Sequence, residues 1–98
     1  MSSSMQRDAS ALRPEVLAFA LAIEDRLRAN DHKGGWQDES VHYLVGRMRQ
    51  EFLEVEHELW PLGGACDAAK VRHEAADIGA FAMMIADVAG DLMKGASS

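Results

Sequence analysis

The fold is decided by the stretch from residue 41 to residue 60, which reads VHYLVGRMRQEFLEVEHELW. Apolar side chains recur in this stretch every three or four residues, at Val41, Leu44, Val45, Met48, Phe52, Val55 and Leu59. That spacing follows the turn of an α-helix and places these side chains along one face. The pattern predicts an amphipathic helix that begins at Asp38 or Ser40 and ends at about Trp60.

Two further helices are predicted, one on each side of this stretch. The first covers about residues 14–30, and Pro14 suits the first turn of a helix. The third covers about residues 67–89, with an apolar stripe formed by Val71, Ala75, Ile78, Ala82, Ile85 and Ala89. Paired glycines at 34–35 and the sequence PLGG at 61–64 separate the three helices, because such residues interrupt helical patterns.

The composition favours an all-α fold. Ala occurs 16 times among the 98 residues, whereas Val and Ile together occur only nine times. Such a chain is rich in helix-forming residues and poor in the β-branched residues typical of strands. We expect one helical domain at residues 13–93, with flexible tails at 1–12 and 94–98. A chain of this size buries only about 60–65% of its extended surface, so we expect a small antiparallel helical bundle completed by self-association.

Charge and cysteine content argue against several classes of protein. Ten Lys and Arg residues against 16 Asp and Glu residues give a net charge of −6. This charge argues against a general nucleic-acid-binding protein and against attraction to an anionic membrane surface. No apolar stretch approaches the roughly 20 residues of a membrane span, and none reads as an export signal. A single cysteine, Cys66, excludes an intrachain disulfide and indicates a reducing compartment, so we expect a cytoplasmic protein.

Two pairs of acidic residues point to a metal site. Glu51 and Glu54 lie on the second predicted helix and Glu74 and Asp77 on the third, each pair separated by three residues and hence on one side. A helical wheel places Glu51 and Glu74 at the edges of their apolar stripes, and the other two about 60° further out. Antiparallel packing would bring the four carboxylates together, where Mg²⁺ or Mn²⁺ would relieve their repulsion. The alternative is that these acids are solvated on exposed helix faces.

The acid pairs and their surroundings resemble the MazG-like branch of the all-α nucleoside triphosphate pyrophosphatases. That family carries an E-E-x-x-E run on one helix and an E-x-x-D run on the next. Here residues 50–54 read QEFLE and residues 74–87 read EAADIGAFAMMIAD. The loop at residues 31–36, DHKGGW, is similar to a segment of short phage- and cassette-type members. The resemblance covers about residues 14–92 and implies Mg²⁺-dependent hydrolysis of a nucleoside triphosphate to the monophosphate and pyrophosphate, by a homodimer or tetramer.

The resemblance also implies the roles of individual residues. The implied metal ligands are Glu51, Glu54, Glu74 and Asp77. Either Glu51 or Glu54 would be the catalytic proton acceptor. Gln50 stands where the family often has its first Glu, and Ala80 stands where related sequences often have Asn. These departures leave open a second hypothesis, a helical protein-interaction module with a degenerate nucleotide site.

Four residues are candidates for substrate binding. Lys33 and His32 lie beside the paired glycines, where they would bind phosphate or form an exposed polar turn. Trp36 would stack on a nucleobase or fill the core beside the loop. Arg47 lies four residues before Glu51, so it would contact the substrate or form an ordinary ion pair along the helix.

Overall fold

The computed structural model describes residues 8–59 and 67–90, and every regular element within these ranges is helical. The elements are η2 (Ala9–Ala11), α1 (Pro14–Ala29), η3 (Asp31–Lys33), α2 (Val41–Leu59) and α3 (Ala68–Gly90). The predicted all-α class is confirmed for this part of the chain. Parts of the sequence interpretation lie outside the described residues, namely the turn at 61–64, Cys66, the tail at 94–98 and the first seven residues of the other tail.

Side chains that precede the helices fix where two of them begin. The Ser40 hydroxyl accepts a hydrogen bond from the Tyr43 backbone N–H at 3.0 Å, at the start of α2. One carboxylate oxygen of Asp67 accepts from the backbone N–H groups of Ala69 and Lys70, at 3.0 and 3.3 Å. These contacts satisfy donors that the first turn of a helix leaves unpaired. The start of α2 therefore follows Ser40, the second of the two predicted positions.

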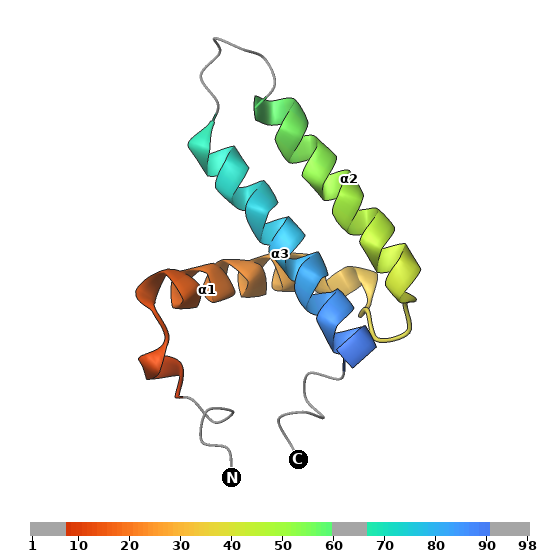
Figure 1. Cartoon of the computed structure of the whole chain (residues 1–98), viewed down its shortest axis with the longest axis horizontal. Helices are drawn as coiled ribbons and strands as arrows, with labels where there is room; N and C mark the ends of the chain where they lie inside the picture. Colours follow the sequence, from red (N-terminus) through yellow and green to blue (C-terminus); the bar gives the residue numbers. More distant parts are fainter. Residues whose placement is uncertain (1–7, 60–66, 91–98) are drawn as a thin grey trace.

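Helices α2 and α3 lie side by side and antiparallel, and α1 crosses them near one end of the pair (Figure 1). The interface between α2 and α3 holds the small buried core. Among the described residues, the fully buried hydrophobic side chains are Leu44, Ala76 and Ala80, with Leu44 only 1% exposed. The small residues on α3 allow close approach of the two helices at this interface.

The crossing of α1 over α3 depends on a glycine. A Cβ atom placed on Gly79 would lie 2.8 Å from Cε2 of Phe19 and 3.0 Å from Cδ1 of Ile23. Such separations are too short for carbon atoms, so a side chain here would force the side chains of Phe19 and Ile23 to shift. The sequence predicts only a cost of about 1 kcal/mol for a glycine within a helix. In the structure, the glycine also leaves room for Phe19 and Ile23 of α1 to pack directly against α3.

Large apolar side chains remain exposed outside this core. They lie on α1, on the segment before it and on the part of α2 that α3 leaves uncovered: Leu12, Val16, Leu17, Phe19, Leu21, Tyr43, Val45, Phe52, Leu53 and Leu59. Several are about half exposed, which is unusual for so many large apolar residues on one small chain. Separately, none of the helices in the described ranges has the length and apolar character needed to cross a membrane.

Candidate functional site

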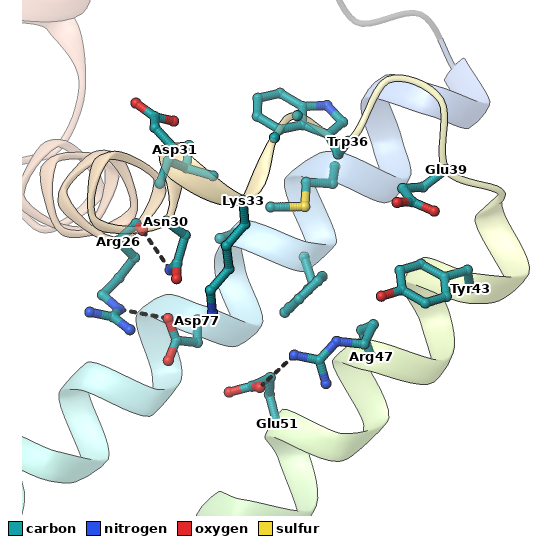
Figure 2. Close-up of a pocket in the computed structure, with 16 residues that line it drawn as sticks. Arg26, Asn30, Asp31, Lys33, Trp36, Glu39, Tyr43, Arg47, Glu51 and Asp77 are labelled. Carbon is teal, nitrogen blue, oxygen red and sulfur yellow. Dashed lines mark hydrogen bonds and ion pairs between the residues drawn. The ribbon is translucent and has the colours of Figure 1, made fainter.

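A cavity of about 340 Å³ lies where the end of α1, the following loop, α2 and α3 meet (Figure 2). Its lining combines positive, negative and aromatic side chains. The cations are Arg26, Lys33 and Arg47, the acids are Asp31, Glu39, Glu51 and Asp77, and the aromatic residues are Trp36, Tyr43 and Phe81. Cations and aromatic rings beside carboxylates form a lining that can bind an anionic ligand with a planar group.

Two acidic residues from the predicted metal site are buried. Glu51 on α2 is 8% exposed and Glu74 on α3 is 7% exposed. Burial raises the pKa of Glu51 above its ordinary value, and the neighbouring carboxylates of Glu54, Asp77 and Glu74 raise it further, against the opposing effect of Arg47. The Oε1 atom of Glu74 is buried and has no hydrogen-bond partner among the described residues. A buried carboxylate oxygen without a partner costs stability, and a cation beside it would offset that cost.

The other two acids of the predicted site are less buried. Asp77 is partly buried and accepts a hydrogen bond from Nε of Arg26 at 2.7 Å, which is also an ion pair. Glu54 is exposed on α2. On each helix, the acid that the helical wheel places nearer the apolar stripe is the more buried one. Glu51 is more buried than Glu54, and Glu74 is more buried than Asp77.

The acids do not form a closed metal site as their side chains stand. In the ranges 8–59 and 67–90, no three His, Cys, Asp or Glu side chains are grouped closely enough to hold a metal ion. The donor set still fits a hard divalent cation, because it consists of carboxylate oxygens and includes the unpartnered oxygen of Glu74. Joining the four acids around one ion requires side-chain rotation, and Arg26 already occupies Oδ1 of Asp77.

Three of the four predicted substrate-binding residues line the cavity. Lys33 points into it from the end of η3, and Trp36 lies at its edge (Figure 2). Arg47 lines the cavity from α2, and its guanidinium group hydrogen-bonds to the side chain of Gln50. A terminal nitrogen of this group lies 3.6 Å from a carboxylate oxygen of Glu51. Its central carbon lies 5.2 Å from the centroid of the Phe81 ring. His32 is exposed in η3 and is not among the lining residues.

A hydrogen bond fixes Trp36 against α3. Its Nε1–H donates to a carboxylate oxygen of Asp87 at 3.1 Å, and this contact joins the loop to the end of α3. The indole nitrogen is therefore occupied, whereas the ring remains part of the cavity lining. Both sequence interpretations of Trp36 are compatible with this position, because one ring can brace the loop and also offer a surface to a ligand.

Several cavity residues are not identifiable from the sequence pattern. Arg26 and Asn30 lie at the end of α1, where the Asn30 side-chain amide donates to the Arg26 backbone carbonyl at 2.9 Å. Tyr43 and Phe81 face the cavity from α2 and α3. The one usable signal is that Arg26 and Asn30 immediately precede the loop that contains Lys33.

Comparison of the chain with models of known protein families, with curated proteins and with solved structures finds no match. The function is therefore inferred from the site's residues and their geometry.

Proposed function

We propose that this protein is a Mg²⁺-dependent nucleotide pyrophosphohydrolase. It would convert ribo- or deoxyribonucleoside triphosphates into monophosphates and pyrophosphate, and so remove unwanted nucleotides. The observation that carries this proposal is the buried acid pair of Glu51 and Glu74, one oxygen of which lacks a partner among the described residues, beside a cavity lined by cations. Buried carboxylates destabilise a fold unless a cation compensates them, so their presence favours a functional site.

The metal would be held by the acids of α2 and α3, namely Glu51, Glu54, Glu74 and Asp77. Mg²⁺ suits this set because it prefers oxygen ligands, and Mn²⁺ is a chemically reasonable substitute. When bound, such an ion neutralises phosphate charge and lowers the pKa of water near the substrate. The resemblance to the MazG-like branch supports the same four residues.

The nucleotide would lie in the cavity with its phosphates toward the cations. Lys33 points into the cavity, and Arg47 lines it on the side of Glu51, so both would bind phosphate oxygens. The ring of Trp36 would stack on the base, since its edge is already anchored by Asp87. His32 lies outside the cavity lining. Its proposed role is therefore limited to an interaction with phosphate charge at the surface of the loop.

The reaction would proceed by attack of water on the triphosphate. Glu51 or Glu54 accepts the proton that the attacking water loses. The linkage between the α and β phosphates breaks, and pyrophosphate leaves with the bridging oxygen or the monophosphate retains it, depending on which phosphorus is attacked. Lys33 and Arg47 stabilise the negative charge that develops on the departing group.

The same proposal includes a homodimer or tetramer that completes an antiparallel helical bundle. The exposed apolar residues of α1 and α2 support it, because three buried hydrophobic side chains among the described residues form a small core for one chain. A second copy would cover Phe19 and Leu21 on α1 or Phe52 and Leu53 on α2. Sedimentation velocity measures the resulting mass directly.

Product analysis tests the proposed reaction. The protein is incubated with a panel of ribo- and deoxyribonucleoside triphosphates in Mg²⁺, and the products are separated by anion exchange. We expect monophosphate and pyrophosphate, which disappear in Glu54→Gln but persist in Glu56→Gln, a matched exposed acid on the same helix. Diphosphate and orthophosphate, or full activity of Glu54→Gln with unchanged helix content, would contradict the mechanism.

The second candidate function is a helical protein-interaction module with a degenerate nucleotide site. The exposed apolar side chains favour it, as does the absence of a closed metal site among the described residues. Thermal melting with and without millimolar Mg²⁺ or Mn²⁺ separates the two functions. A working four-acid site is stabilised by its ion through mass action, whereas the module shows no shift.

A further inference from the structure

An arginine forms an ion pair with one of the acids proposed to bind metal. Nε of Arg26, on α1, donates to Oδ1 of Asp77, on α3, at 2.7 Å, and both side chains are largely shielded from water. Both residues line the cavity (Figure 2). A cation therefore compensates the charge of Asp77 at the same place where the proposed metal would do so.

The contact uses only part of the guanidinium group. Among the described residues, the hydrogen bond of the Arg26 guanidinium group comes from Nε, and the two terminal nitrogens donate none. Arg47 is held differently, because Gln50, Glu51 and the ring of Phe81 all contact its guanidinium group. Arg26 has one side-chain partner to lose, and its planar fork matches the oxygens of a phosphate group.

We propose that Arg26 exchanges partners when the site is loaded. Without metal it neutralises Asp77; when a divalent ion takes Asp77, Arg26 turns to the phosphate chain of the substrate. This inference rests on the proposed function and adds a substrate-binding residue that also competes with the metal. The charge of Asp77 is compensated in both states, by Arg26 without metal and by the divalent ion when the site is loaded.

The first half of the proposal predicts that removing Arg26 strengthens metal binding. Mn²⁺ alone is titrated into the full chain and followed by calorimetry, with circular dichroism to show that helix content is retained. We expect Arg26→Gln to bind Mn²⁺ about fivefold more tightly, the effect of removing a competing, partly buried ion pair. Arg28→Gln is the matched control, because it removes the same charge from the same helix but breaks an exposed pair with Glu24. It should leave Mn²⁺ affinity within about twofold of the wild type.

The second half predicts that removing Arg26 weakens phosphate binding. Inorganic tripolyphosphate, which has no base or sugar, is titrated into the protein at saturating Mn²⁺. Arg26→Gln should bind it at least about tenfold more weakly, as expected for loss of a hydrogen bond between charged groups. Arg26→Lys retains the charge without the planar fork and should fall between the wild type and Arg26→Gln in both titrations.

Opposite movement of the two affinities distinguishes partner exchange from a structural role. Unchanged or weaker Mn²⁺ binding in Arg26→Gln would overturn the inference, because Arg26 would then orient Asp77 rather than compete for it. Equal tightening in Arg28→Gln, or unchanged tripolyphosphate binding in Arg26→Gln, would overturn it as well. In those cases the proposed function stands if the wild type binds Mn²⁺, whereas a wild type that binds no Mn²⁺ overturns the proposed function itself.

Discussion

Replacing Glu74 by Gln should raise the free energy of unfolding when no divalent metal is present. In the presence of metal, the variant should instead be less stable than the wild type. The substitution retains the shape of the side chain and removes a carboxylate that is 7% exposed and has an unpartnered oxygen among the described residues. Without metal the variant should therefore be more stable than the wild type. With metal the wild type should be more stable, because it retains the ligand.

The magnitudes follow from two separate contributions. An unsatisfied buried polar group costs about 1–3 kcal/mol, and the Gln amide recovers part of it, so we expect a gain of about 1 kcal/mol without metal. In a domain of this size that gain raises the melting temperature by about 4–8 °C. Mg²⁺ at one hundred times its dissociation constant stabilises the wild type by about 2.7 kcal/mol, which exceeds the gain of the variant.

Urea unfolding followed by circular dichroism measures both contributions, at one protein concentration and neutral pH. Each protein is unfolded in EDTA and again in Mg²⁺. Glu56→Gln is the control, since it makes the same change at an exposed position on α2 and should leave both curves nearly unchanged. A wild type more stable than Glu74→Gln in EDTA would refute the assignment of Glu74 as an uncompensated buried acid. Equal stabilisation of both proteins by Mg²⁺ would refute its assignment as a ligand.

Three further predictions concern packing, pH and the loop. Gly79→Ala should lower the free energy of unfolding by about 1 kcal/mol, because overpacking against α1 outweighs the gain in helix propensity, and urea unfolding measures it. Gly46→Ala, where the new Cβ has no neighbouring atom within 4 Å, should instead raise it by about 1 kcal/mol. Because the pKa of Glu51 is raised above 4.5 by burial and neighbouring acids, the folded state retains a proton that the unfolded chain has lost. The metal-free protein should therefore lose stability as the pH rises above 4.5 until the pKa of folded Glu51 is passed, and Glu51→Gln should flatten this decline in urea titrations at several pH values. Asp87→Ala should remove the hydrogen bond to Trp36, lower the free energy of unfolding by about 0.5–1.5 kcal/mol and shift tryptophan fluorescence to longer wavelength; an unchanged spectrum would contradict the contact.

The helices are predictable from the sequence because their determinants are local. Apolar spacing within 41–60 fixes α2, and Ser40 and Asp67 cap the first turns of α2 and α3. The burial of Glu51 and Glu74 follows from the same spacing, since a helical wheel relates each acid to its own apolar stripe. These features require no knowledge of how the helices cross.

The crossing of α1 over α3 cannot be read from the sequence in the same way. Arg26 and Asp77 are 51 residues apart, as are Trp36 and Asp87, and each pair meets only because α1 and its following loop lie against α3. The different positions of His32 and Lys33 depend on the turn of η3. The close contact at Gly79 likewise depends on the path of α1, so its sequence signal is an unexplained glycine in a helix.

A crystal structure grown in Mn²⁺, with anomalous scattering data, determines whether the buried acids of α2 and α3 form a divalent metal site. We predict an anomalous peak between the two helices, about 2.0–2.3 Å from carboxylate oxygens that include Glu51 and Glu74. Well-ordered density for both helices, with no anomalous peak between them, would contradict the proposed metal site.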